Sequence, residues 1–233
     1  MFPFLDHPGP IPFAHRGNAA GQAENTLAAF RAVVDLGFRY VETDVRTTRD
    51  GKLVVFHDRT LERIAGVDRP VGTLRHAELA EFAVPLLTDV LESFPGTRFN
   101  VDMQDWPAVE ALAGVLRTTR STDRLCVASF SERRLRRIRR LAGPRLCTSA
   151  GVGGVARFVL GRPTGAAAIQ APVSLLRPTL ISRARRAGLK FHVWTLNDRE
   201  AISGAVAAGV DGIMTDEPIV LQDVLRDLGR WFG

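Results

Sequence analysis

Several features are scarce in this 233-residue chain, and each scarcity excludes a class of protein. Only two cysteines are present, Cys126 and Cys147. They are too few for a disulfide framework and predict a reduced, cytoplasmic chain with two inert core thiols. No apolar run approaches the roughly 20 residues that span a bilayer, so no transmembrane segment is expected. The opening residues, MFPFLDHPGP, lack the basic and apolar regions of a cleaved signal peptide.

Lysine is equally rare. Of the 31 lysine and arginine residues, only Lys52 and Lys190 are lysines. The net charge of +6 permits weak attraction to nucleic acid or to anionic membranes. However, the arginine-rich stretch 132–140 lacks the interleaved aromatic residues of a single-strand binder. We therefore expect an exposed basic helix face there and no nucleic-acid partner. Nothing in the sequence predicts an oligomeric state.

What the chain does contain is a regular alternation of short β-type runs and longer helical patterns. Eight such units in one chain of this length predict an α/β fold, a single-domain (β/α)8 TIM barrel spanning residues 1–233. A doubly wound open sheet is the alternative. The expected strands are 11–15, 40–47, 98–104, 125–130, 145–150, 166–171, 190–196 and 212–215. The expected helices are 26–36, 86–94, 108–117, 132–141, 155–160, 178–187, 199–208 and 219–228.

One segment interrupts this alternation after the second strand. Residues 52–57 read as a further strand, joined to the second one by the turn signal Arg49-Asp50-Gly51. Residues 59–85 then form an irregular connection with one short helix near 74–82. We expect this hairpin and loop insertion to overhang the carboxyl-terminal mouth of the barrel, where barrel enzymes carry out their chemistry.

Carboxylates cluster at the ends of the second and third strands. Glu42 and Asp44 are spaced i, i+2, so a strand places both on one face, and Asp102 occupies the same kind of position on the next strand. Acidic groups inside a barrel need neutralisation, and a divalent cation supplies it. Because Mg²⁺ and Ca²⁺ both prefer oxygen ligands, we predict one of them at Glu42, Asp44 and Asp102. Pairing of these acids with arginines is the alternative.

Two histidines flank the carboxylates, and they suggest proton transfer. His15 ends the first strand and His57 ends the hairpin strand. A pair of histidines can supply one acid and one base near neutral pH. Arg16 adds a planar guanidinium suited to a phosphate oxygen, so the set favours attack on a phosphoester.

Two further segments near the carboxyl end carry weaker predictions. Trp194 and His192 share one strand face, so one of them is a candidate wall of the substrate pocket, and we choose Trp194. Asn197 precedes the acidic start of the next helix and is expected to be its N-cap.

Taken in order along the chain, these residues resemble the signature of glycerophosphodiester phosphodiesterases. The resemblance rests first on His15-Arg16-Gly17, Glu24-Asn25-Thr26, Glu42-Thr43-Asp44-Val45, Asp50-Gly51 and His57-Asp58. It extends to Val193-Trp194-Thr195-Leu196-Asn197 and to the stretch 209–216. It implies a barrel hydrolase that uses Mg²⁺ or Ca²⁺ to cleave small glycerophosphodiesters into glycerol 3-phosphate and an alcohol.

Carried over by position, the resemblance makes His15 and His57 the general acid and base. It makes Arg16 a phosphate contact, and Glu42 and Asp44 metal ligands. In the family's mechanism the glycerol hydroxyl next to the phosphoester attacks phosphorus, and water then opens the resulting cyclic phosphate.

The chain departs from the family pattern at three positions. Ala23 stands where a proline usually precedes the Glu-Asn-Thr triplet. On the third strand, Asp102 and Gln104 replace a glutamate ligand and a lysine. Gln104, a candidate substrate contact, therefore removes a positive charge near the phosphate. Two alternatives follow: a lysophospholipase D-like phosphodiesterase at a membrane surface, or a weakened barrel that binds phosphodiesters without turnover.

Overall fold

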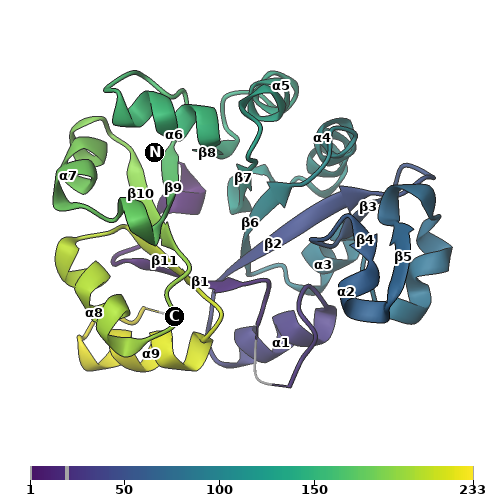
Figure 1. The fold of residues 1–233 in the computed structure, drawn as a ribbon, viewed down its shortest axis with the longest axis horizontal. Coiled ribbons are helices and arrows are strands. Elements are labelled where there is room, and N and C mark those ends of the chain that lie inside the picture. The colour runs from purple at the N-terminus through teal and green to yellow at the C-terminus, as the bar shows by residue number, and fades with distance from the viewer. Residues whose placement is uncertain (1, 19–20, 233) are drawn as a thin grey trace.

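The computed structural model describes residues 2–18 and 21–232, and it forms a closed barrel of eight parallel strands surrounded by helices (Figure 1). The strands pair in the order β1-β2-β6-β7-β8-β9-β10-β11, and β11 pairs with β1 to close the barrel. The expected (β/α)8 barrel is therefore confirmed. The barrel strands are β1 (Ile11–His15), β2 (Tyr40–Thr47), β6 (Arg98–Met103), β7 (Leu125–Ala128), β8 (Cys147–Ala150), β9 (Ala168–Pro172), β10 (Lys190–Trp194) and β11 (Gly212–Thr215).

The helices follow the strands as the periodicity predicts, with shifts of a few residues at the ends. The helix expected at 155–160 starts three residues earlier, directly after the turn at Gly151. The α-helices of the barrel are α1 (Leu27–Asp35), α3 (Leu87–Ser93), α4 (Ala108–Thr119), α5 (Glu132–Ala142), α6 (Val152–Val159), α7 (Pro178–Arg186), α8 (Arg199–Ala208) and α9 (Pro218–Asp227).

The insertion after β2 contains more structure than the sequence predicts. β3 (Leu53–Val55) pairs antiparallel with the end of β2, as the turn at Gly51 indicates. The connection expected to be irregular also holds a two-stranded hairpin of β4 (Thr60–Leu61) and β5 (Val67–Pro70), with α2 (Glu62–Ala65) between them. Its short helix is a 3₁₀ helix, η3 (His76–Phe82). A further 3₁₀ turn, η2 (Val71–Thr73), belongs to the same connection, whereas η4 (Thr122–Arg124) directly precedes β7.

Two apolar layers hold the barrel together. Outward-facing strand residues such as Val41 and Val45 pack against the surrounding helices in one large buried cluster. Inside the barrel, Phe13 and Tyr40 form an apolar layer at the amino-terminal end with Phe4 of the 3₁₀ turn η1 (Pro3–Leu5). The Tyr40 hydroxyl donates a hydrogen bond to the Phe4 carbonyl at 3.0 Å. Because one end of the barrel is filled in this way, a cavity can open only at the other end.

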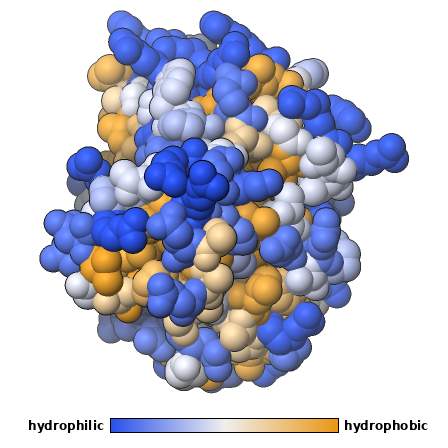
Figure 2. Space-filling view, turned by 90° about the vertical axis from the view of Figure 1, so that its right-hand side faces the viewer, coloured by the Kyte–Doolittle hydropathy of each residue, from blue (hydrophilic) through white to orange (hydrophobic). Residues whose placement is uncertain are grey.

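One face of the molecule is predominantly polar (Figure 2). The face over the insertion, shown in Figure 2, carries hydrophilic residues over most of its area, with hydrophobic residues in small groups between them. In the described part of the chain, no helix is both long enough and apolar enough to cross a bilayer. Cys126 and Cys147 are buried and free, as expected.

Candidate active site

A cavity of about 800 Å³ opens at the carboxyl-terminal end of the barrel. The strands place polar side chains there because alternate residues of each strand point into the barrel. In the register, Glu42 lies beside both His15 of β1 and Asn100 of β6, and Asp44 lies beside Asp102. All eight side chains singled out in the sequence line this one cavity: His15, Arg16, Glu42, Asp44, His57, Asp102, Gln104 and Trp194.

Of the three predicted metal ligands, Glu42 and Asp44 are buried and Asp102 is partly buried, and they crowd one another. Burial raises the pKa of Glu42 well above its usual range, and the charge of Asp44 raises it further. Burial and the same Asp44 charge raise the pKa of Asp102 to about 7. The Asp102 Oδ1 atom is buried without a hydrogen-bond partner. Clustered carboxylates with an orphaned oxygen are suited to a divalent cation, which would offset both the repulsion and the missing contact.

Asp44 already has several partners. The Gln104 side-chain amide donates to Asp44 Oδ1 at 2.6 Å, and Asn25 donates to Oδ2 at 3.3 Å. The Arg16 Nε also forms an ion pair with Oδ2 at 3.3 Å. As these side chains stand, no three His, Cys, Asp or Glu residues among 2–18 and 21–232 are grouped as a metal site. Release of Oδ1 by Gln104 would make Asp44 available to a cation.

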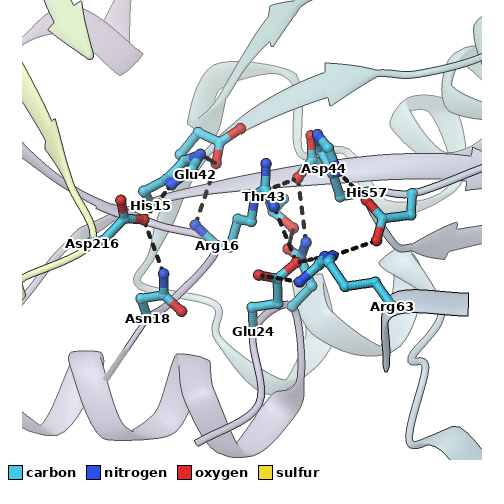
Figure 3. A network of polar contacts seen from close by, with 12 residues as sticks. His15, Arg16, Asn18, Glu24, Glu42, Thr43, Asp44, His57, Arg63 and Asp216 are labelled. Carbon is cyan, nitrogen blue, oxygen red and sulfur yellow. Dashed lines mark hydrogen bonds and ion pairs between the residues drawn. The ribbon is translucent and has the colours of Figure 1, made fainter. Parts of the chain in front are cut away.

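His15 is held by a carboxylate that the sequence analysis did not single out (Figure 3). Its Nδ1 lies 2.6 Å from Asp216 Oδ1, and Asp216 also accepts hydrogen bonds from Asn18 and Asn197. Burial lowers the pKa of His15, but the Asp216 hydrogen bond and the Glu42 charge outweigh it, so the net shift is upward. The hydrogen bond from His15 also lowers the pKa of Asp216 to about 2. Because a carboxylate only accepts, Nδ1 of His15 is the donor, and Nε2 remains for proton transfer.

His57 has a similar carboxylate partner, supplied by the insertion. Its Nδ1 lies 2.6 Å from Asp58 Oδ1, and the Arg63 guanidinium donates to Asp58 Oδ2 at 2.6 Å. Arg63 also pairs with Glu24, which in turn pairs with Arg16 at 3.1 Å. These contacts link His57 to the loop after β1 (Figure 3). The insertion therefore positions a histidine over the mouth of the barrel.

The loop after β1 needs an unusual backbone to place Arg16. Arg16 and Gly17 both have positive φ angles, of 53° and 65°. A Cβ atom on Gly17 would lie 2.4 Å from Cδ1 of Phe30, so only glycine fits this turn. The turn directs the Arg16 guanidinium between Glu24 and Asp44, which it pairs with in the structure.

Three residues of this site escaped the sequence analysis. Asn25 was noted only within a motif, yet its side chain is buried, accepts from Thr43 at 2.7 Å and donates to Asp44. The prediction of Asn197 as a helix N-cap is wrong, because Asp198 caps α8 by accepting from the Ala201 amide. Asn197 instead supports Asp216. The closed barrel offered a signal for Asp216, since the end of the last strand must lie beside the end of the first.

The rest of the cavity is uncharged and largely apolar, with Ser129, Ser149 and Gln170 as its polar side chains. None of the lining residues in the described part of β7 through β11 and their connections carries a charge. The apolar part of the lining consists of Ala128, Phe130, Ala150, Val152, Val155, Ala156, Val159, Leu160, Pro172, Leu175, Trp194 and Met214. Trp194 lies on this side, with its ring 6.4 Å from that of Phe130, whereas its strand neighbour His192 is fully buried below.

Comparisons with known proteins agree with this geometry. A sequence profile of the glycerophosphoryl diester phosphodiesterase family matches residues 15–220. A probable glycerophosphodiester phosphodiesterase 2 from Mycobacterium tuberculosis is 36% identical over 99% of this chain and 96% of its own length. A glycerophosphodiester phosphodiesterase from Caldanaerobacter subterraneus is 29% identical over 94% of this chain and 99% of its own. The crystal structure of a putative glycerophosphoryl diester phosphodiesterase from Silicibacter pomeroyi superimposes with a TM-score of 0.84 at 25% identity, covering 98% of this chain and 99% of that one.

Proposed function

This chain belongs to the glycerophosphoryl diester phosphodiesterase family, and from that premise we propose that it cleaves glycerophosphodiesters by metal-assisted acid–base catalysis at His15 and His57. Hydrolysis of a glycerophosphodiester is the family's activity, and the chain is accordingly a phosphoric diester hydrolase. The observation that carries the mechanistic proposal is the matched support of the two histidines. Each has its Nδ1 2.6 Å from an aspartate oxygen, and both line one cavity with the carboxylates of Glu42, Asp44 and Asp102.

We assign the proton donor from the electrostatics of the two sites. His15 contacts the carboxylates of Asp216 and Glu42, which raise its pKa and so favour the protonated form of its ring. His15 is therefore the proposed acid in the first step, and His57 is the proposed base.

The proposed reaction has two steps. First, a glycerol hydroxyl of the substrate gives its proton to His57 while its oxygen bonds to phosphorus. The bond from phosphorus to the alcohol oxygen breaks, and His15 protonates the departing alcohol. A water molecule then attacks the cyclic phosphate and gives its proton to His15, while His57 returns a proton to the glycerol oxygen. The sum is hydrolysis, and both histidines end as they began.

Glu42, Asp44 and Asp102 are the proposed holders of a Mg²⁺ or Ca²⁺ ion, and Asp102 contributes the otherwise orphaned Oδ1. When bound, such an ion stabilises negative charge on the phosphoryl oxygens. Gln104 controls the availability of Asp44 through its hydrogen bond to Oδ1. Arg16 is the proposed phosphate contact from the other side, since its guanidinium lies at the edge of the same carboxylate cluster. Trp194 is a proposed contact for the remainder of the substrate.

The proposal is tested by assaying glycerophosphocholine, glycerophosphoethanolamine and glycerophosphoglycerol with Mg²⁺, Ca²⁺, Mn²⁺ or EDTA. We expect metal-dependent release of glycerol 3-phosphate that EDTA abolishes. Full activity in EDTA would contradict the metal proposal. Absence of turnover by folded, metal-binding protein would instead indicate a barrel that only binds phosphodiesters, the role that Gln104 favours. We further propose a cytoplasmic location, supported by the two free buried cysteines and testable by cell fractionation.

A further inference from the structure

Arg63 lies in the insertion and contacts two carboxylates at once (Figure 3). Its Nε donates to Asp58 Oδ2 at 2.6 Å. The other edge of the same guanidinium donates to both oxygens of Glu24, from Nη2 at 2.5 Å and from Nη1 at 3.3 Å. Asp58 belongs to the insertion, whereas Glu24 belongs to the loop after β1, 39 residues before Arg63. One side chain therefore joins two segments that carry different parts of the site.

Each of these carboxylates also holds a residue of the proposed reaction. Asp58 accepts from Nδ1 of His57 through Oδ1, and Glu24 accepts from the Arg16 guanidinium through Oε1 at 3.1 Å. Partial burial raises the pKa of Asp58 and of Glu24, but the hydrogen bonds from their partners outweigh burial, so both pKa values lie below their usual range. Both carboxylates therefore stay ionised and only accept hydrogen bonds.

The backbone of Arg63 is fixed by the small hairpin of β4 and β5. The helix α2 fills the connection between these strands and ends at Gly66, whose φ of 66° reverses the chain. Leu61, directly before α2, is buried in the apolar cluster of the insertion. The Arg63 side chain itself is 49% exposed. Because solvent screens exposed ion pairs, the contacts of Arg63 contribute little to stability, and we expect their effect to be on orientation.

We propose that Arg63 is a positioning residue for both the proposed base, His57, and the proposed phosphate contact, Arg16. The inference rests on the proposed function for the roles of these two residues. Through Asp58, the guanidinium keeps the proton on Nδ1 of His57, so that Nε2 is free to accept a proton from the substrate. Through Glu24, it holds Arg16 beside the carboxylate cluster. A planar guanidinium presents separate edges to two carboxylates, which the ammonium group of lysine cannot do.

Each of the two contacts has a variant of its own, and Arg63→Met removes both. Asp58→Asn should lower kcat for glycerophosphocholine about 10- to 100-fold while the Kd for glycerol 3-phosphate, measured by calorimetry with Mg²⁺ present, stays within about twofold. Glu24→Gln should raise this Kd about five- to tenfold and lower kcat no more than about threefold. Arg63→Met should show both losses, each about five- to tenfold. Adding Glu24→Gln to Arg63→Met should weaken binding no further, because the two residues act through one contact.

Three readouts and one control distinguish positioning from a structural role. The Tm of Arg63→Met should stay within about 4 °C of that of the unaltered protein. Arg63→Lys should recover one of the two losses but not both. The alkaline limb of the kcat/KM profile reports the proposed acid, His15, and should not move, because Asp216 at the end of β11 holds that ring. Arg69→Met breaks an exposed ion pair with Glu78 in the same insertion and should match the unaltered enzyme throughout.

Several results would overturn the inference. If Arg63→Met matched Arg69→Met in both kcat and Kd, the guanidinium would only cover the surface. A larger fall in Tm, or a displaced alkaline limb, would make Arg63 a structural residue of the insertion. Full recovery of both losses in Arg63→Lys would show that the charge acts without positioning.

A measurement that needs no turnover separates this inference from the proposed hydrolysis. If the unaltered protein cleaves none of the glycerophosphodiesters, the proposed hydrolysis fails. The ¹⁵N NMR signals of the His57 ring then report its tautomer, and Arg63→Met should add the second tautomer to the single Nδ1–H form. This change, together with the weaker binding of glycerol 3-phosphate, would support the positioning role of Arg63. An unchanged tautomer and an unchanged Kd would overturn it.

Discussion

His15 and Asp216 stand 201 residues apart in the chain, and their side chains meet at 2.6 Å because the last barrel strand pairs with the first. The contact fixes which ring nitrogen of His15 carries the proton and raises the pKa of the ring against the effect of burial. Asp216 is thus a positioning residue, held in turn by Asn18 and Asn197.

Replacement of Asp216 is expected to change the pH profile as well as the rate. Asp216→Asn removes the carboxylate that raises the pKa of His15, so His15 loses its proton at lower pH. We expect kcat to fall about 10- to 100-fold and the alkaline limb of the kcat/KM profile to move to lower pH. Asp227→Asn, which breaks only the exposed ion pair with Arg199, should change neither. A lower rate with an unmoved limb would show that Asp216 has a merely structural role.

The histidines are expected to be separable from the metal site. His15→Ala and His57→Ala each remove a proposed proton carrier, and we expect turnover to fall at least about 100-fold in either variant. Neither ring is a proposed ligand, so Mg²⁺ affinity measured by calorimetry should stay within about threefold. Asp102→Asn should instead reduce the Mg²⁺ affinity itself, by about tenfold or more. Equal losses of metal affinity in both histidine variants would contradict their assignment to proton transfer.

Gln104 offers a test of the charge missing from the third strand. The Gln104→Lys variant places an ammonium group where the amide now donates to Asp44. We expect kcat/KM for glycerophosphocholine to rise about tenfold. One hydrogen-bond donor near a phosphoryl oxygen typically changes the rate by about 10²–10³, and pairing of the new ammonium group with Asp44 reduces that gain. Gln170→Lys adds the same charge beside Asn100 in the same cavity and should not raise it. A fall in kcat/KM with the fold unchanged would mean that the pocket serves a less charged substrate.

His192 is expected to make the fold sensitive to acid. Its ring is fully buried, neither nitrogen has a hydrogen-bond partner, and burial lowers its pKa to about 4. The unfolded chain takes up this proton near pH 6.5, whereas the folded chain resists it. The free energy of unfolding is therefore unaffected by this group above pH 6.5. It decreases as the pH falls from 6.5 toward 4. At about 1.4 kcal/mol per pH unit the loss amounts to about 3 kcal/mol.

The measurement is urea unfolding of the native protein and of His192→Leu at several pH values between 7 and 4. We expect the free energy of unfolding of the variant to depend less steeply on pH over this interval. His192 also packs against Phe13, with the two ring centroids 5.1 Å apart. Loss of this packing changes the free energy of unfolding of the variant by the same amount at every pH, so it does not alter the pH dependence. Parallel curves for the two proteins would show that His192 does not titrate with unfolding.

Several features of the site follow from local sequence. The alternation of β and α patterns predicts the barrel, and three strands, β1, β2 and β11, begin and end where the sequence indicates. Period-two spacing predicts that Glu42 and Asp44 face inward together. Parallel strands then bring the side chains at their carboxyl ends to one mouth, so His15, Glu42 and Asp102 converge as expected.

Tertiary structure alone decided which partners these residues contact and which surface the apolar face of α6 lines. Asp216 reaches His15 only because the barrel closes, and Arg63 joins Asp58 to Glu24 only because the insertion lies beside the loop after β1. Helical periodicity identifies an apolar face at Val152, Val155 and Val159 but does not say whether that face meets the core or a ligand. Phe158 already packs into the core from the opposite side, so the second apolar face is left lining the cavity. Local sequence sets which way a side chain points from its own strand or helix, whereas the packing of distant segments determines what it meets.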